Sequence, residues 1–477
     1  MKKADPNPRA NKNILKLAYA MIALFLGLVV YQGYFLTAES ETVINNSYNS
    51  RLDSFADRVI RGDIRANDGT VLATTQVDEA GNETRVYPKG SVFDHVVGYS
   101  SKGKTGIESL ANFYLLTSHV NLIEQTVNEL SGEKNLGDDV YTTLDAELQQ
   151  TAYDALGNRR GAVIALEPDT GKILAMVSKP GYDPNTIAAD WEALTSSDNT
   201  SGQLLNRATQ GLYPPGSTFK IVTALEYMRE NPSGWQDYEY DCNGLYTNGE
   251  YKIRCYHGTA HGHQDFLHAF ANSCNGAFAS LGLTLDLELF SKTASDLLFG
   301  QELPLSGINY KQSSFAMKPG ADTWEILQTS MGQGATQITP MHNAMITAAI
   351  ANGGTLMQPY LLDRVENAGG QEIKKFLPIS SKSLMTAQEA ANLTQLMRAV
   401  VTDGTGSAVR TDAYTVAAKT GSAEFESGKE THAWFTGFAP AESPKLVVTV
   451  IVEESGSGGK QAAPIARKLF DLYLGNS

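Results

Sequence analysis

The chain has 477 residues, of which 42% are hydrophobic and 19% charged, and this composition excludes disordered, collagen-like and small disulfide-rich proteins. At roughly 100 to 200 residues per domain, the length predicts two or three domains. The 38 Lys and Arg against 52 Asp and Glu give a net charge of −14, and no long basic run follows Lys16, so no nucleic-acid partner is expected.

An apolar segment from Ile14 to Leu36 predicts a transmembrane helix. About 23 residues at ~1.5 Å each can cross a hydrocarbon core of ~30 Å. Basic residues precede the segment and the first charges beyond it are Glu39 and Glu41, so the positive-inside rule predicts a short cytoplasmic tail over residues 1–13. A cleaved signal peptide is the alternative. The long apolar core without a small-residue cleavage site favours an uncleaved anchor over residues 14–36 in the bacterial cytoplasmic membrane, with the rest of the chain outside.

Residues 37–140 are expected to form a small non-catalytic module after the anchor. The segment from Arg61 to Ala73 predicts a strand, an Asn-Asp-Gly turn and a second strand. A helix is expected to start at Gly106. These short mixed elements indicate a pedestal for the larger domain that comes after residue 140.

Residues 141–477 are expected to form an α+β domain whose sheet draws strands from both of its ends. Asp145 caps a helix predicted over Ala146 to Leu156, and a terminal helix is expected near Pro464. The region from about 204 to 401 is mostly helical in pattern and includes a helix from Met341 to Ala351. Two strands before this helical subdomain and three after it predict an antiparallel five-stranded sheet flanked by helices, with strands over residues 162–166, 172–178, 414–424, 433–438 and 446–453.

Ser217 and Lys220 are candidates for nucleophilic chemistry. They stand three residues apart at the start of a segment with helical periodicity, so both side chains share one face. A desolvated lysine can accept the hydroxyl proton of such a serine. The motif alone is more often an N-cap serine followed by a solvated lysine.

Two further motifs follow along the chain. Ser273-Cys-Asn275 places polar groups in an otherwise apolar run between Phe270 and Phe278. Lys419-Thr420-Gly421 falls on a predicted strand, where glycine is costly unless a ligand backbone must approach closely. Each motif is weak evidence by itself.

Together, S-x-x-K, S-x-N and K-T-G occur in the order and approximate separations of the penicillin-recognising serine enzymes. The sequence resembles a class B penicillin-binding protein, a D,D-transpeptidase of bacterial cell-wall synthesis, and most of all the penicillin-binding protein A type. The resemblance implies the penicillin-binding transpeptidase fold without a cofactor. It extends over nearly the whole chain after residue 61 and includes the segments RGDIRANDGTVLA, GKTGIESLANFYLL, TTLDAELQQTAYDAL, YPPGSTFKIVTA, MGQGATQITPMHNAMITAAIANGG and HAWFTGFAP.

The resemblance implies a role for each residue of the first two motifs. Ser217 would attack the penultimate D-Ala carbonyl of a stem pentapeptide to form an acyl-enzyme, with Lys220 as its base. Ser273 would relay a proton between Lys220 and the leaving amine. Asn275 would orient Lys220 and bind the substrate amide.

The third motif is implied to bind the substrate. Lys419 would supply positive potential, Thr420 would bind the terminal carboxylate, and Gly421 would let the substrate approach. Backbone N–H groups of Ser217 and Ser422 would form the oxyanion hole. The family more often has threonine at the position of Ser422, which leaves the backbone role unaffected.

The resemblance also implies partners. The substrate would be a peptidoglycan stem pentapeptide or its lipid-linked precursor, and β-lactam antibiotics would acylate the same serine. The anchor leads directly into the first module rather than into a glycosyltransferase domain. A membrane-embedded glycan polymerase of the kind used in elongation, cell shape, division or sporulation is therefore the expected partner.

Two other enzymes with the same nucleophile are alternatives. A D,D-carboxypeptidase passes the same acyl group to water, and the acceptor cannot be read from the motifs. A serine β-lactamase is less favoured, because class D enzymes carry S-x-V where this chain has Asn275. The class A deacylation motif E-x-x-L-N is absent as well, since Gly202 stands where the glutamate would be.

The remaining cysteines and histidines do not predict a metal site. His257, His261, His263 and His268 lie in a glycine-rich loop expected beside the active site, and no cysteine or carboxylate spacing completes a set of ligands. A disulfide between Cys242 and Cys255 stays open. Cys274, inside the S-x-N motif, is expected to be a small buried hydrophobe.

Overall fold

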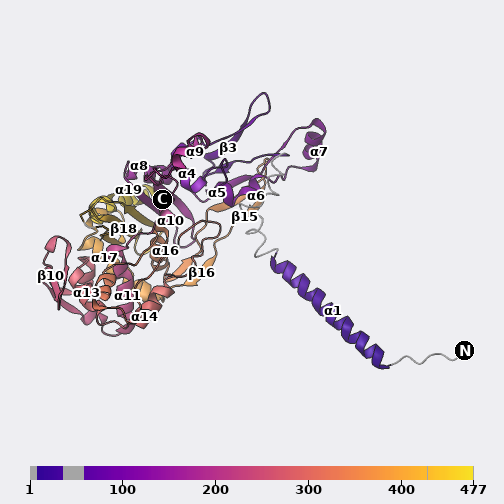
Figure 1. Cartoon of the computed structure of the whole chain (residues 1–477). Helices are drawn as coiled ribbons and strands as arrows, with labels where there is room; N and C mark the ends of the chain where they lie inside the picture. Colours follow the sequence, from indigo (N-terminus) through magenta and orange to yellow (C-terminus); the bar gives the residue numbers. More distant parts are fainter. Residues whose placement is uncertain (1–7, 36–57, 427, 476–477) are drawn as a thin grey trace.

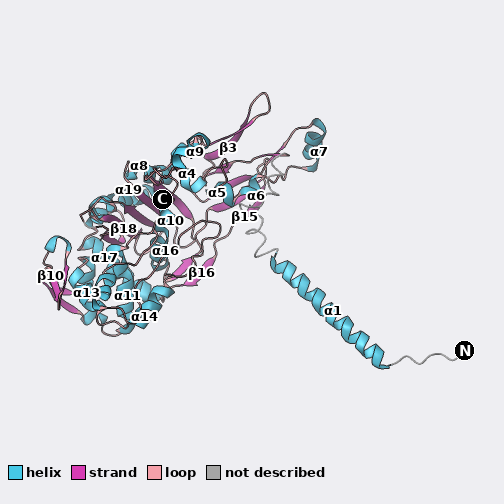
Figure 2. Ribbon diagram, in the orientation of Figure 1, coloured by secondary structure: helices cyan, strands magenta, loops and turns pink. Residues whose placement is uncertain are grey.

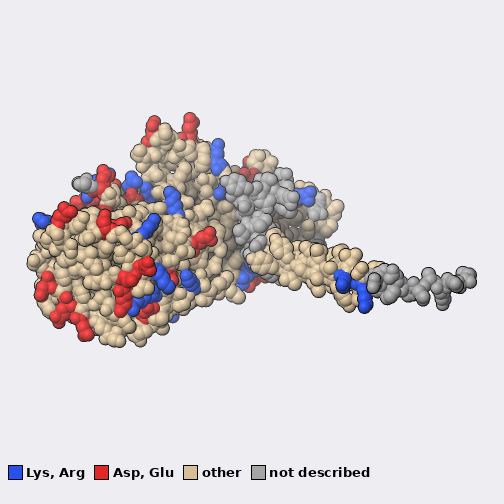
Figure 3. Space-filling model, turned by 60° about the horizontal axis from the view of Figure 1, so that its bottom comes forward, with Lys and Arg blue, Asp and Glu red and all other residues tan. Residues whose placement is uncertain are grey.

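A computed structural model describes residues 8–35, 58–426 and 428–475 of the chain (Figure 1). Helix α1 (Pro8–Tyr34) projects away from the folded part of the molecule. Its segment Lys12–Tyr34 has a mean hydropathy of 2.2, and none of its apolar window is buried against the rest of the protein. Basic side chains lie at its N-terminal end (Figure 3). The predicted anchor is therefore a helix long and apolar enough to cross a membrane. Leu36 and residues 1–7 of the predicted tail lie outside the described residues.

A six-stranded sheet forms the core of the N-terminal module. The predicted hairpin is confirmed: β2 (Ile64–Arg65) and β3 (Val71–Val77) pair antiparallel around a turn in which Gly69 has a φ of +87°. The strand order is β15-β14-β6-β2-β3-β4. Two of these strands come from far along the chain, so the sheet joins the module to the region after residue 141. The other strands are β4 (Glu83–Val86), β6 (Asp139–Thr142), β14 (Leu362–Glu366) and β15 (Glu372–Lys375).

Short helices and a two-stranded parallel pair complete this module. The helix predicted at Gly106 is α5 (Gly106–Leu110), whose Glu108 is buried between Arg61 and Arg85. The other elements are β1 (Val59–Ile60) paired with β5 (Asn135–Leu136), α4 (Asp94–Val97), α6 (Asn112–Leu115) and α7 (Leu122–Ser131).

The predicted five-stranded antiparallel sheet is confirmed in the order β17-β18-β19-β7-β8. Its central strand β19 pairs with β18 on one side and with β7 on the other, so segments more than 250 residues apart share a ladder. Sequence and structure agree on helix α8 (Ala146–Leu156), where the Asp145 side chain accepts a hydrogen bond from the Leu148 N–H. The strands are β7 (Gly161–Leu166), β8 (Ile173–Lys179), β17 (Ala417–Ala423), β18 (His432–Ala439) and β19 (Leu446–Val452).

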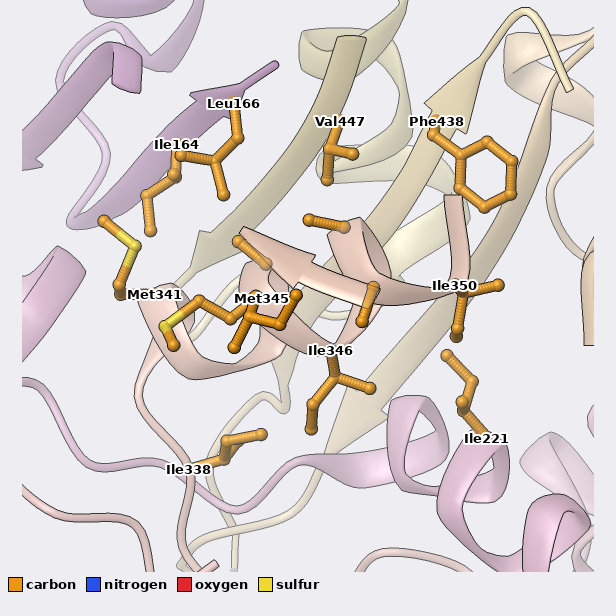
Figure 4. Packing of buried hydrophobic residues seen from close by; sticks show 14 of the residues in the cluster. Ile164, Leu166, Ile221, Ile338, Met341, Met345, Ile346, Ile350, Phe438 and Val447 are labelled. Carbon is orange, nitrogen blue, oxygen red and sulfur yellow. The ribbon is translucent and has the colours of Figure 1, made fainter. Parts of the chain in front are cut away.

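Helices cover both faces of this sheet. On one face, α8 and the terminal helix α19 (Ala463–Gly475) pack on alternate strand residues such as Val163, Phe435 and Val450. On the other face, Ile164, Leu166, Val447 and Phe438 point toward α16 (Pro340–Ala351), as Figure 4 shows. The period of two along each strand thus supplies two separate apolar cores.

A helical subdomain interrupts the sheet in sequence and gathers on the side of the molecule away from α1 and α7 (Figure 2). It confirms the expected helical insertion, but it also contains short hairpins that the sequence did not predict. One of them has a two-residue turn at Gly249-Glu250, where glycine stands first and has a φ of +56°. The helices include α11 (Lys220–Glu230), α12 (Phe266–Ala271), α13 (Asn275–Gly282), α14 (Leu287–Asp296), α15 (Thr323–Ser330) and α17 (Ala387–Thr402); the hairpin strands are β9 (Glu239–Cys242), β10 (Leu245–Asn248), β11 (Tyr251–Arg254), β12 (Gly262–Asp265), β13 (Thr355–Met357) and β16 (Ser380–Ser383).

Candidate active site

Ser217 lies on a tight turn that leads into helix α11. The turn is a 3₁₀ helix (Gly216–Phe219), and Gly216 enters it with a φ of +53° that favours glycine. The apolar residues of α11 are buried in the core, which fixes the turn in place. Ser217 is half-buried and lines a cleft of about 490 Å³.

Lys220 is fully buried one turn further on and uses all three of its ammonium hydrogens. The Nζ atom donates to Ser273 O at 2.7 Å, Ser273 Oγ at 3.1 Å and Asn275 Oδ1 at 2.8 Å. Burial lowers the pKa of Lys220 to about 8. At pH 7, Lys220 is then neutral in roughly a tenth of the molecules, and the neutral amine is the form that can accept a proton.

Ser273 and Asn275 join helix α12 to helix α13. Ser273 has a φ of +55°, a conformation that costs a non-glycine residue about 1–3 kcal/mol and is typical of functional sites. Its carbonyl and hydroxyl both face Lys220. The amide of Asn275 donates to Arg254 O at 2.9 Å and thereby links the motif to the end of strand β11.

Strand β17 brings the third motif to the same place. Lys419 is fully buried and donates to Ser273 Oγ at 2.9 Å, so that hydroxyl receives hydrogen bonds from two lysines. Burial, and then the charge of Lys220, lower the pKa of Lys419 well below its usual value. Thr420 Oγ1 lies 2.6 Å from Thr405 Oγ1.

Gly421 was expected to let the substrate approach closely, but in the structure it lets the Ser217 turn approach strand β17. A Cβ at this position would lie 3.3 Å from both Ser217 N and Thr218 N, which is tighter than most Cβ contacts. The crowding therefore comes from the protein's own nucleophile turn. Glycine here lets strand β17 lie directly against Ser217.

The cleft brings together Ser217, Ser273, Asn275, Thr420, Gly421 and Ser422, while Lys220 and Lys419 are buried behind Ser273. A hydroxyl nucleophile, an amine of lowered pKa and a second hydroxyl between two lysines can carry out acyl transfer. Their assigned roles stay predictions. Two further residues contact the motifs but were not among the predicted site residues. Thr405 contacts Thr420, and the side chain of Gln333 donates to Ser422 O at 3.4 Å. Gln333 belongs to the MGQGATQITP segment that carries part of the family resemblance, but the segment did not predict this contact.

One of the four discounted histidines lies in an unexpected cluster. His261 Nδ1 is 3.3 Å from Cys242 Sγ, and the other two cysteines lie beside them. The remaining histidines lie elsewhere: His263 contacts Asp241, His268 contacts Asp265, and His257 lines the cleft. Spacing along the chain did not predict this cluster, because Cys274 reaches it from a separate helix.

Comparison with known families agrees with this geometry. Residues 161–471 match the penicillin binding protein transpeptidase domain, and residues 61–140 match the penicillin binding protein A dimerisation domain. The chain belongs to the penicillin-binding proteins. The transpeptidase match spans the five-stranded sheet and the helical subdomain, and the dimerisation match falls within the N-terminal module.

Relatives and solved structures resemble this penicillin-binding protein over most of their length. The peptidoglycan D,D-transpeptidase PbpA of Mycolicibacterium smegmatis is 32% identical, over 97% of this chain and 99% of the relative. A ceftriaxone acyl-enzyme complex of penicillin-binding protein A from M. tuberculosis is similar with a TM-score of 0.80 at 31% identity, covering 88% of this chain and 99% of the other. A D,D-transpeptidase domain from Eggerthella lenta gives a TM-score of 0.79 at 32% identity, with the same coverage.

Proposed function

We propose that this penicillin-binding protein is a peptidoglycan D,D-transpeptidase that crosslinks stem peptides through an acyl-enzyme on Ser217. The observation that carries the proposal is the shared hydrogen bonding of Ser273 Oγ, which accepts from Lys220 at 3.1 Å and from Lys419 at 2.9 Å beside the nucleophile turn. The PbpA relatives, named peptidoglycan D,D-transpeptidases, support the same reaction.

Acylation follows from these positions. Neutral Lys220 takes the proton of Ser217 Oγ as that oxygen attacks the carbonyl carbon of the penultimate D-Ala. The N–H groups of Ser217 and Ser422 stabilise the developing oxyanion, at roughly 3 kcal/mol for each donor. As the peptide C–N bond breaks, the proton passes from Lys220 through Ser273 Oγ to the leaving D-Ala amine. Thr420 binds the carboxylate of that D-Ala, and Lys419 supports it with positive potential.

Deacylation reverses the proton path. An amino group of a second stem peptide loses its proton through Ser273 to Lys220 and attacks the carbonyl carbon of the Ser217 ester. The crosslinking amide forms as the ester C–O bond breaks, and Lys220 returns the proton to Ser217 Oγ. A second groove of about 840 Å³ shares Arg254, Asn275 and Gln333 with the cleft and offers space for a second peptide. A β-lactam would follow the first half of this path and stop at the ester.

The location of the reaction is part of the proposal. Basic residues precede the apolar segment of α1 and acidic residues follow it, and this charge difference supports a location of the folded part outside the cytoplasmic membrane. Transpeptidation joins peptides but makes no glycan strand. A membrane glycan polymerase would therefore supply the strands that this protein crosslinks.

Penicillin labelling of the full chain tests the nucleophile. We expect one adduct, mapped to the peptide that holds Ser217 and lost in Ser217→Ala. Matched Ser280→Ala, which changes an α13 serine away from the cleft, should be labelled normally. Labelling that persists in Ser217→Ala would refute the assignment.

A donor–acceptor assay separates the transferase from its two alternatives. An acyl-enzyme that lasts an hour faces a barrier of roughly 22 kcal/mol, against about 15 kcal/mol for turnover at ~100 s⁻¹. We expect the penicilloyl-enzyme to last from many minutes to hours, and a pentapeptide thioester donor to be transferred to an added D-amino acid. Rapid penicillin hydrolysis would indicate a β-lactamase, and release to water that no acceptor changes would indicate a carboxypeptidase.

A further inference from the structure

Three cysteines and one histidine converge at one wall of the cleft, and two of them, Cys255 and His261, line it. Cys242 Sγ lies 3.6 Å from Cys255 Sγ and 3.3 Å from His261 Nδ1, and Cys255 Sγ lies 3.7 Å from Cys274 Sγ. All four ligand atoms are within 4.8 Å of one another. The three cysteines are buried and free, and His261 is half-buried.

These distances correspond to the edges of a tetrahedron around a metal ion. Zinc–sulfur bonds of about 2.3 Å place two sulfur ligands ~3.8 Å apart, and a zinc–nitrogen bond of ~2.0 Å places nitrogen about 3.5 Å from each sulfur. A disulfide would use two of the cysteines and leave the third buried against His261 without a partner. A four-ligand site accounts for all four residues.

We propose that Cys242, Cys255, His261 and Cys274 bind one zinc ion in a structural Cys₃His site. Thiolates and an imidazole are the ligands that zinc takes in closed structural sites, where no position is left for water or substrate. Binding replaces the thiol protons, so the metal-bound cluster has three thiolates, a neutral histidine and one net negative charge. The site has no part in bond making.

The backbone around the cluster suits bound thiolates. Cys274 is the N-cap of helix α13, and its Sγ accepts from the Ala277 N–H at 3.5 Å. The N-terminus of a helix carries partial positive charge, and N–H donors of this kind stabilise negatively charged sulfur ligands.

The ion would fasten the wall of the cleft to the S-x-N motif. Cys242 ends strand β9, and its register partner in β12 is Gly262, which directly follows His261 in the chain. The third ligand, Cys255, follows β11 and precedes the cleft-lining residues 256–258. The fourth, Cys274, lies between Ser273 and Asn275. Zinc would therefore hold this loop against the residues that contact Lys220.

Metal content of the full chain, purified in detergent with a reductant, tests the site. We expect one zinc per chain in the wild type and almost none in Cys242→Ser or His261→Ala. The matched variant His263→Ala changes a neighbouring exposed histidine and should keep its zinc. Cobalt supplied in place of zinc should give thiolate-to-cobalt charge-transfer absorption. A zinc-free wild-type chain, a Cys242–Cys255 disulfide found by peptide mapping of protein purified without reductant, or equal zinc in all four proteins would overturn the site.

Reversible removal of the metal tests the fastening role, which rests on the proposed function. Chelation should slow penicillin acylation by roughly tenfold or more, because a misplacement of ~1 Å in an active site can cost ~10²-fold, and added zinc should restore the rate. An unchanged acylation rate in the metal-free protein would refute the fastening role. A chain that binds zinc and is never acylated would contradict the proposed function while supporting the metal site.

Discussion

The five-stranded sheet beside Ser217 and the six-stranded sheet of the N-terminal module differ in how their strands are buried. Every residue of β7, β18 and β19 is buried, because helices cover both faces. In β4 and β15, by contrast, no residue is fully buried. The first sheet is held by apolar packing on both faces, whereas the module has an apolar core and relies in addition on buried charge.

The charged cluster of the module shows this reliance clearly. Glu108 has no exposed side-chain area and pairs with Arg61 at 2.6 Å and with Arg85 at 2.7 Å. Two guanidinium groups facing one carboxylate hold the pKa of Glu108 at about 2 in spite of burial. The active-site sheet is therefore packed with apolar residues on both faces, and the N-terminal module adds a buried charge cluster to its apolar core. Substitutions in the two regions should affect different measurements.

The largest effect is expected from removing the base. Lys220→Ala should slow penicillin acylation by ~10²- to 10⁴-fold, the usual contribution of a positioned acid or base, while the sheet stays folded. Stopped-flow acylation measures the rate, and near-UV circular dichroism reports the packing. Lys292→Ala, which removes an exposed lysine paired with Asp296 on α14, is the control. A normal rate in Lys220→Ala would exclude this lysine from the mechanism.

In the N-terminal module, Glu108→Gln should reduce stability by about 3–5 kcal/mol, because Arg61 and Arg85 then face each other without a buried counter-charge. Urea unfolding of the full chain reports the loss, and penicillin acylation by the folded protein should be unchanged. Glu83→Gln breaks a partly exposed pair with Lys134 and should cost less than about 1 kcal/mol. Equal effects of the two variants would contradict the proposed dependence on the buried charge.

On strand β17, Gly421→Ala should slow acylation by ~10- to 10²-fold, because the added Cβ pushes the strand away from Ser217. Global stability should change little if the strand shifts locally. Gly234→Ala is the matched control, since a Cβ there meets only Asp237 Oδ2 at 3.6 Å. A rate equal to that of the wild type would show that the nucleophile turn adjusts to the contact.

The pH profile of acylation should follow Lys220. Burial lowers its pKa to about 8, so the fraction of Lys220 that is neutral increases as the pH rises through that value. Acylation should increase about tenfold from pH 7 to a plateau above pH 9, in proportion to the neutral fraction. The rise should disappear in Lys220→Ala. A rate that falls over this range in the wild type would assign the proton transfer to another group.

The smallest effect is expected at the edge of the carboxylate site. Thr405→Val removes the hydroxyl that lies 2.6 Å from Thr420 Oγ1. Losing one neutral hydrogen bond costs ~1 kcal/mol, so turnover of a D-Ala-terminated donor should fall roughly fivefold. Thr402→Val changes an exposed threonine at the end of α17 and should have no effect on turnover. An unchanged donor turnover in Thr405→Val would remove Thr405 from the site.

Local sequence signals predicted the elements whose causes are local. The capped helix α8 and the five strands of the active-site sheet follow from periodicity and capping residues that stand next to each other in the chain. The motif residues Ser217, Ser273 and Lys419 converge on one cleft, although their roles stay predictions. Thr405 carried no pattern of its own, because its importance comes from a contact across the fold.

Pairings between distant segments could not be read in the same way. Strands β14 and β15 are short, and β15 has no buried residue. Strand β14 pairs with β6, which lies some 200 residues earlier in the chain, so neither periodicity nor spacing marks the pairing. The cluster around His261 has the same origin, because its fourth member, Cys274, belongs to another helix. Tertiary contacts override chain spacing in both cases.

The shared six-stranded sheet has a consequence for the order in which the protein folds. Strand β6 ends at Thr142, and its neighbour β14 begins at Leu362. A chain made from its N-terminus must therefore produce about three quarters of its length before this sheet can be completed. Until then β6 presents an unpaired edge to other chains. A truncation before Leu362 would make that edge permanent and should yield aggregates rather than an isolated N-terminal module.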